Sequence, residues 1–182
     1  QVLTGIPASV GIAQAIKETG WGTSGLSKNY HNLHGAKTGD KDGNDPNAPC
    51  SSNPNPGPLD VPWRGVRLAT QEEMYFGSRK YRVWVYACFK VYNSDYDSFL
   101  DWALRFYRFA LKDSKIKEAL AYRRNWEAFL NAGALYNYAT GSGYVDSIKD
   151  IIKTYQLYRY DVPIEYWNLL PQVARIMPIP GT

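Results

Sequence analysis

Apolar residues recur at helical spacing in the first and last thirds of this chain and alternate with polar residues in between. In the first third, this spacing predicts a helix in which Pro7 occupies the first turn and Gly20 ends the helix. A second, short helix is predicted for residues 23–28, so residues 5–35 are expected to be helical. The apolar side of the first helix comprises Ile12, Ala15, Ile16 and Thr19.

The middle of the chain has a different pattern. Residues 63–92 alternate aromatic and β-branched residues with polar ones, and Gly77 and Ser78 provide a turn, so this segment is predicted to form a β-hairpin. Residues 37–62, which precede it, are dense in Gly, Asp, Asn and Pro. A loop of this length is unusual as a simple connector, so we expect it to be functional or mobile.

Helical spacing resumes after the hairpin, and Gly133 is expected to end one of these helices. The tail, residues 161–182, contains four prolines and is predicted to wrap the surface of a catalytic domain formed by residues 1–160. Helices around one small hairpin lobe predict an α+β fold without internal repeats. The predicted helices cover residues 95–111, 114–122, 125–132 and 142–155.

Glu18 is the first candidate for chemistry because it falls in the last turn of the first helix, three residues before Trp21. The negative end of a helix dipole disfavours an ionised carboxylate, and a neighbouring indole would desolvate it. Both effects favour the protonated form that a glycosidase needs for its general acid. The alternative is an ordinary solvated glutamate at the end of a helix.

Charge and composition narrow the classes of partner. A net charge of +4 and a pI near 8.9 suit an anionic partner such as a cell wall or a nucleic acid. The basic clusters at residues 79–82 and 123–124 are short, and no nucleic-acid motif is present, so no nucleic acid is expected. Fifteen tyrosines and six tryptophans suit a carbohydrate groove, although cores also contain such residues.

The start of the chain and the length of its apolar runs indicate where in the cell the protein is expected. No run of 18 apolar residues occurs, so no membrane span is expected. The absence of an initiator methionine and of a signal peptide indicates a mature or excised domain.

Three blocks in residues 5–36 resemble the start of a bacterial glucosaminidase domain of glycoside hydrolase family 73, which cleaves peptidoglycan. They are Gln-Ala-x-x-Glu-Thr-Gly-Trp-Gly at 14–22, Ser-x-Leu at 24–26 and Asn-Leu-x-Gly at 32–35. The resemblance continues at residues 89–94, Phe-Lys-Val-Tyr-Asn-Ser, and at Tyr138-Ala139-Thr140 followed by Tyr144. Because the blocks keep the family's order over most of residues 5–160, the resemblance implies a lysozyme-like fold.

The resemblance also implies a second functional glutamate before the hairpin turn, in the segment Thr70 to Gly77. Counting back from Gly77 favours Glu73, counting forward from Thr70 favours Glu72, and turn spacing leads us to prefer Glu73. Strand alternation places the two on opposite faces, so at most one faces the groove. Ordinary exposed strand residues remain the alternative for both. Tyr75 of the same segment is a candidate substrate-binding residue.

Other candidate substrate-binding residues are Tyr138, Trp21 and His34. Tyr138 matches a cleft tyrosine of the family, whose hydroxyl would bind the 2-acetamido group of the sugar or orient a water; a core tyrosine is the alternative. His34 stands where the family more often has phenylalanine, either as a polar contact in the cleft floor or as a buried substitute. Gly141 and Ser142 replace the family's Asp-Pro, and Asn137 replaces a glycine.

The implied activity is hydrolysis of the β-1,4 bond after N-acetylglucosamine, with Glu18 as the acid. Either Glu72 or Glu73 would activate water in an inverting reaction, or the substrate's own acetamide would attack. A muramidase or lytic transglycosylase is the nearest rival, and a non-catalytic wall-binding module is the rival of another class. We expect an extracellular, cell-wall or periplasmic monomer that acts on peptidoglycan glycan strands and needs no cofactor.

Metal sites and cysteine chemistry give weaker signals. His31 and His34 are the only histidines and have no recognisable third ligand, so no zinc site is expected. Residues 40–51 fail as a calcium loop because Gly43 comes two positions early and Ser51 replaces the bidentate glutamate. Neither a Cys/His/Asn set nor a Gly-x-Ser-x-Gly elbow suggests a nucleophilic hydrolase. The two cysteines would either bridge the long loop to the hairpin or remain free thiols: Cys50 and Cys88.

Overall fold

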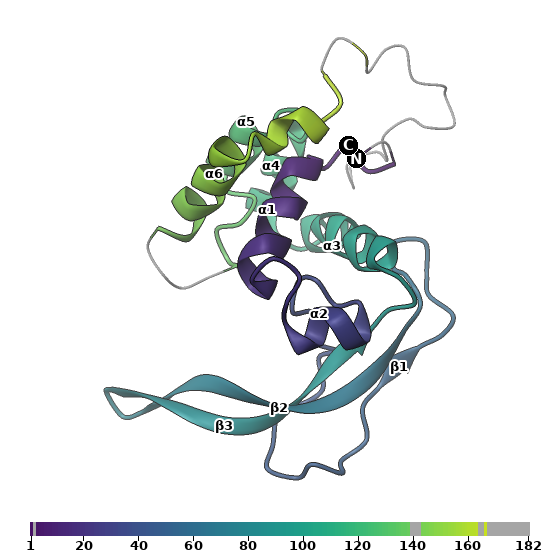
Figure 1. Ribbon diagram of the computed structural model, residues 1–182, viewed down its shortest axis with the longest axis vertical. Coiled ribbons are helices and arrows are strands. Elements are labelled where there is room, and N and C mark those ends of the chain that lie inside the picture. The colour runs from purple at the N-terminus through teal and green to yellow at the C-terminus, as the bar shows by residue number, and fades with distance from the viewer. Residues whose placement is uncertain (2, 139–142, 164–165, 167–182) are drawn as a thin grey trace.

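Helices form one lobe of the structure, and a long antiparallel hairpin forms the other (Figure 1). The computed structural model describes residues 1, 3–138, 143–163 and 166. This arrangement confirms the predicted mixed fold, mostly helical with a hairpin lobe. The helices are α1 (Ala8–Thr19), α2 (Gly25–Tyr30), α3 (Asp95–Ala110), α4 (Ser114–Ala121), α5 (Trp126–Asn131) and α6 (Tyr144–Thr154), followed by the 3-10 turn η1 (Leu157–Tyr160).

Short polar side chains define where four of the helices begin. Each accepts a hydrogen bond from a backbone N–H of the first turn, which satisfies a group that the helix itself leaves unpaired. The second helix begins two residues later than predicted, because Ser24 is its cap and residues 20–23 form a turn. Residues 31–35 are not helical, so the prediction for 5–35 was too long. The capping residues are Ser24, Ser94, Asp113 and Asn125.

The sheet has three antiparallel strands in the order β1 (Ser52–Asn53), β2 (Trp63–Phe76) and β3 (Arg79–Val91). The predicted hairpin is confirmed, and Gly77 adopts a φ of 64° at its turn, a conformation that favours glycine. The long loop is less irregular than predicted, since it contributes β1 and two isolated bridges to β3.

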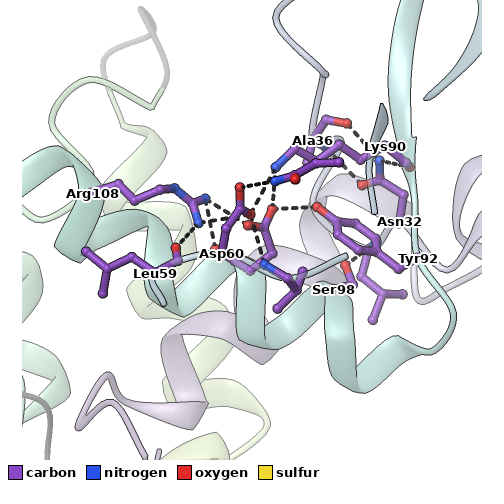
Figure 2. Close-up of polar contacts among 12 residues, drawn as sticks. Asn32, Ala36, Leu59, Asp60, Lys90, Tyr92, Ser98 and Arg108 are labelled. Atoms are coloured by element: carbon purple, nitrogen blue, oxygen red, sulfur yellow. Dashed lines mark hydrogen bonds and ion pairs between the residues drawn. The ribbon is translucent and has the colours of Figure 1, made fainter. Parts of the chain in front are cut away.

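A buried ionic cluster fastens the base of the hairpin to α3 (Figure 2). Lys90 of β3 lies 3.0 Å from Asp101 of α3, and Arg108 lies 2.8 Å from the other oxygen of the same carboxylate. Tyr92 donates a further hydrogen bond to Asp101, and Asp60 contributes a second carboxylate. Buried charges are tolerated when paired and hydrogen-bonded in this way, so the cluster fixes the relative position of the two lobes.

We expect this cluster to make stability depend on acid pH. Burial alone would raise the pKa of Asp101, but the charges of Arg108 and Lys90 outweigh it and lower that pKa from 3.8 to about 2. A carboxyl with a depressed pKa stabilises the fold above its unfolded pKa and loses this effect as the pH falls through the folded value. Asp101 should therefore contribute about 2 kcal/mol at neutral pH that disappears between pH 4 and pH 2.

Urea unfolding of the wild type and of Asp101→Asn across pH 2–7 measures this contribution. The difference between their free energies of unfolding should shrink toward acid pH. A constant difference over the whole range would contradict the assignment.

Cys50 and Cys88 form a disulfide, which settles the alternative left open by the sequence. The bridge ties the long loop to β3, and the backbone of Gly65 runs so close beneath Cys50 that a Cβ at position 65 would lie 2.4 Å from the Cys50 Cβ. Asp40 strengthens the same loop by accepting hydrogen bonds from the backbone and hydroxyl of Ser51.

Reduction of the disulfide should destabilise the protein. Opening a loop that spans 38 positions should cost about 2–4 kcal/mol, because the unfolded chain regains entropy. Calorimetry with and without reductant measures the midpoint, and a Cys50→Ala/Cys88→Ala double variant provides the control, since reductant should leave its midpoint unchanged. An equal midpoint for the reduced and oxidised wild type would contradict this expectation.

The first part of the predicted tail contacts the N-terminal segment. The backbone N–H and hydroxyl of Ser9 donate to the Asp161 carboxylate at 2.9 and 2.6 Å, and the N–H of Val162 donates to Gln1. The remainder of the predicted extension, residues 164–165 and 167–182, lies outside the described residues.

Candidate active site

An unusual turn ends α1 immediately after Glu18. Gly20, Trp21 and Gly22 all have positive φ values, of 57°, 64° and 72°. The N–H of Trp21 donates to the carbonyl of Ile16, and the N–H of Gly22 donates to the hydroxyl of Thr19 at 2.7 Å. A left-handed tryptophan costs about 1 kcal/mol, so these contacts must hold the turn in place. The turn confirms Gly20 as the end of the predicted helix.

Glu18 and Trp21 are both exposed on this end of the helical lobe. The indole of Trp21 is 58% exposed, and its ring packs edge-on against Tyr155 with centroids 4.6 Å apart. Trp21 therefore presents a supported aromatic surface near the candidate acid.

A chain of hydrogen bonds leads from the core to Glu18. The indole N–H of Trp102 donates to Gln14 at 2.7 Å, the Gln14 amide donates to the Tyr144 hydroxyl at 2.9 Å, and that hydroxyl donates to Glu18 Oε1 at 2.7 Å. Since the amide of Gln14 occupies a lone pair of the hydroxyl, the Tyr144 proton is directed at Glu18. The chain orients one carboxyl oxygen and leaves the other, Oε2, available for a substrate.

Burial of the Tyr144 ring raises the pKa of its hydroxyl, and the charge of Glu18 raises it further. Tyr144 is therefore a hydrogen-bond donor throughout the neutral range. Its ring stacks on Tyr138 with centroids 5.4 Å apart, and the Tyr138 hydroxyl donates to the backbone carbonyl of His34 at 2.9 Å. These contacts bring Glu18, Tyr144 and Tyr138 together from distant parts of the sequence.

The side chain of His34 is buried, with 4% of its surface exposed. It stacks on Trp102, contacts Phe99 edge-on and hydrogen-bonds the carbonyl of Gly11 through Nε2 at 3.2 Å. Burial lowers its pKa to about 3, so the imidazole is neutral. Of the two interpretations from sequence, this geometry favours the buried substitute, and only the backbone carbonyl of His34 reaches the Tyr138 hydroxyl.

The two hairpin glutamates lie on opposite faces, as the register pairs Glu72 with Val83 and Glu73 with Arg82. Glu72 forms an ion pair with Lys37 at 2.7 Å, and Lys37 also binds Asp42. The hydrogen bonds that Lys37 donates to these two carboxylates raise its pKa despite partial burial, so the ammonium remains charged beside Glu72.

The disulfide identifies the face on which each glutamate lies. Cys88 shares its face with Glu73, and the long loop packs there, where Arg67 binds the carbonyls of residues 48 and 49. Figure 1 shows the helices on one side of the hairpin and the loop before β1 on the other. Glu72 therefore lies on the hairpin face opposite the disulfide, where it binds Lys37.

Glu73 forms an ion pair with Lys80 across the hairpin, at 2.5 Å. Tyr75 shares the face of Glu73 and is 69% exposed. This arrangement does not favour our sequence-based preference for Glu73 over Glu72, and it separates Tyr75 from the face that carries Glu72.

In the described part of the chain, potential metal-binding side chains cluster in one grouping. This grouping comprises Asp40, Cys50 and Cys88. The sulfurs of the two cysteines form the disulfide, so neither is a free thiolate ligand. His31 pairs with Asp95 at 2.8 Å, away from the buried contacts of His34. Of the described helices, none is both long and apolar enough to cross a bilayer.

Three contributors to the site were missed as site residues from sequence: Gln14, Tyr144 and Lys37. Gln14 and Tyr144 occupy matched positions of the family blocks, which was the available signal. Their roles depend on contacts between residues 130 and 126 positions apart, which local sequence does not specify. Lys37 gave no signal, because its role follows from the way that the loop lies against β3.

A helix-end glutamate in a helical lobe and a second glutamate on a hairpin are compatible with the two-carboxylate chemistry of glycoside hydrolases. A family model described as "Glucosaminidase: Mannosyl-glycoprotein endo-beta-N-acetylglucosaminidase" matches residues 1–157. The chain belongs to this glucosaminidase family.

An individual relative supports the same family membership. Exo-glucosaminidase LytG of Bacillus subtilis (strain 168) is 29% identical over 154 residues, which cover 84% of this chain and 45% of the relative. The chain thus spans about half the length of that relative.

Solved structures share the fold. The catalytic domain of the autolysin Auto from Listeria monocytogenes has a TM-score of 0.58 at 24% identity, over 86% of this chain and 76% of that one. An N-acetylmuramoyl-L-alanine amidase from Staphylococcus aureus has a TM-score of 0.55 at 24% identity, over 91% of this chain and 41% of that one.

Proposed function

We propose that this domain is a peptidoglycan hydrolase that cleaves the β-1,4 bond after N-acetylglucosamine. The observation that carries the proposal is the position of Glu18 at the end of α1, where Tyr144 orients its carboxyl group. The family match and the glucosaminidase name of the relative support the choice of sugar.

In the proposed reaction, Glu18 protonates the glycosidic oxygen through Oε2. A bound glycan covers the exposed carboxyl group and desolvates it, which favours the protonated form. After proton transfer, the hydrogen bond from Tyr144 to Oε1 stabilises the carboxylate that forms.

We assign Glu72 as the base that activates water in an inverting reaction. Glu72 forms an ion pair with Lys37 at 2.7 Å and lies on the hairpin face opposite Glu73. Attack by the substrate's acetamide is the competing mechanism, in which Glu72 has no role as a base.

Two aromatic residues are proposed to contact the sugars. Trp21 offers an exposed ring for stacking on a pyranose face. The Tyr138 hydroxyl donates to the His34 carbonyl and forms a hydrogen bond with Arg105, and its remaining lone pair would accept from the acetamide N–H of N-acetylglucosamine. An extracellular or cell-wall location is proposed as well, and the disulfide supports it. A monomer remains a prediction.

Mass spectrometry of digested, borohydride-reduced muropeptides tests the reaction. Reduced glucosamine ends are expected. Reduced muramic ends would indicate a muramidase, and 1,6-anhydro ends would indicate a lytic transglycosylase. In a separate assay, binding to cell walls without solubilising them would indicate a non-catalytic module. The size distribution of early products distinguishes internal cleavage from release at chain ends, which matters because the family description says endo and the name of the relative says exo.

A further inference from the structure

A cavity of about 400 Å³ lies beside the site, between α3, the start of α4 and the segment that ends at Tyr138. Its lining includes neither Glu18 nor Glu72, the residues assigned to proton transfer. Its walls are mainly apolar, and the side chains that form them include Phe106, Phe109, Ile116 and Leu135.

Tyr138 connects this cavity to the candidate acid. The residue lines the cavity, and its ring stacks on Tyr144, whose hydroxyl binds Glu18. Tyr138 and Tyr144 therefore connect the cavity to the carboxyl group of Glu18.

Two cations, Arg105 and Lys112, also line the cavity. The guanidinium of Arg105 lies 4.8 Å from the centroid of the Tyr138 ring and 5.7 Å from that of Phe106. Within the described residues, neither cation forms an ion pair with a carboxylate. No described carboxylate therefore neutralises either charge, although Arg105 also forms a hydrogen bond with the Tyr138 side chain.

The one carboxylate of the lining, Asp113, is already engaged. It caps α4 by accepting from the N–H groups of Lys115 and Ile116, and its other oxygen accepts from the Tyr136 hydroxyl at 2.6 Å. Two cations and one engaged carboxylate leave the cavity with a positive balance, which suits an anionic ligand with an apolar body.

We propose that this cavity binds the peptide substituent of the glycan, a short peptide that carries free carboxylates. Alkyl groups of the peptide pack on the apolar walls, and a carboxylate pairs with Arg105, whose planar guanidinium binds carboxylates through two donors. The inference rests on the proposed function, because it assigns a specificity subsite to the same substrate.

The test is a binding measurement that does not depend on turnover. Glu18→Gln serves as the background, and calorimetry compares the tetrasaccharide repeat of peptidoglycan with and without its stem peptides. The peptide-bearing form should bind about tenfold more tightly, the scale of one partly desolvated ion pair. Arg105→Gln in this background should abolish the preference, Arg105→Lys should restore part of it, and Lys112→Gln should reduce it. Arg159→Gln, which removes an exposed arginine that does not line the cavity, is the matched control.

Equal dissociation constants for the two saccharides, or the same loss of affinity for both on Arg105→Gln, would overturn the subsite. The second result would assign Arg105 only to the positioning of Tyr138. Digestion of cell walls by the wild-type protein is a separate measurement. If the wild type does not digest walls, the proposed hydrolase activity is wrong. The preference for the peptide-bearing saccharide is measured by binding and does not depend on that result.

Discussion

Glu18→Gln should lower the rate of wall lysis by a hundredfold or more, the usual scale for loss of a general acid. The amide keeps the shape of the side chain and can still accept the hydrogen bond from Tyr144, but it has no carboxylic proton to donate. The thermal midpoint should be unchanged or slightly higher, because a carboxylate at the C-terminal end of a helix opposes the helix dipole.

Turbidity loss of purified cell walls and thermal melts of the same preparations measure the two effects. Glu118→Gln is the matched control, since Glu118 is exposed on α4 and its loss should leave lysis unchanged. A folded Glu18→Gln protein with near wild-type lysis would show that the central assignment is wrong.

Glu72→Gln should lower lysis by about a hundredfold, because an amide cannot accept a proton from the attacking water. Its effect on stability should be below about 1 kcal/mol, since the ion pair with Lys37 is partly exposed and screened by solvent. Activity and stability should therefore separate in this variant.

Glu73→Gln provides the control within the same strand. It lies on the opposite face and pairs with Lys80, so its loss should leave lysis near the wild-type level. Retention of lysis by Glu72→Gln would instead favour attack by the acetamide of the substrate. A large loss confined to Glu73→Gln would reverse the assignment of faces.

Local signals were sufficient for most elements of the fold. The alternation in residues 63–92 and the turn at Gly77 predicted the hairpin, because a strand places alternate side chains on alternate faces. The helical elements were predicted to within a few residues, since apolar spacing and Gly20 mark helix faces and ends. The errors fell at boundaries, such as the start of α2, where the hydroxyl of Ser24 decides which residue is the cap.

The candidate site was only partly predictable. Glu18 was found from its position at a helix end and from the family resemblance. The choice between Glu72 and Glu73 could not be made from the sequence. A shift of one residue in the strand register exchanges the two faces of the hairpin, and the hairpin pattern alone does not show which face meets the helices. His34 was uncertain for a related reason, as its burial depends on the rings of Phe99 and Trp102, far along the chain.

The sequence by itself determined the helices, the hairpin, the family and the candidate acid, because each depends on residues close together in the chain or on a motif within it. Tertiary structure decided that Cys50 and Cys88 are joined, that Tyr144 orients Glu18 and that Glu72 lies on the hairpin face opposite the disulfide. Each of these depends on packing between segments that are distant in sequence, for which local propensity contains no information. The contacts of the long loop with the hairpin, through the disulfide and through Arg67 and Lys37, depend on its position in three dimensions.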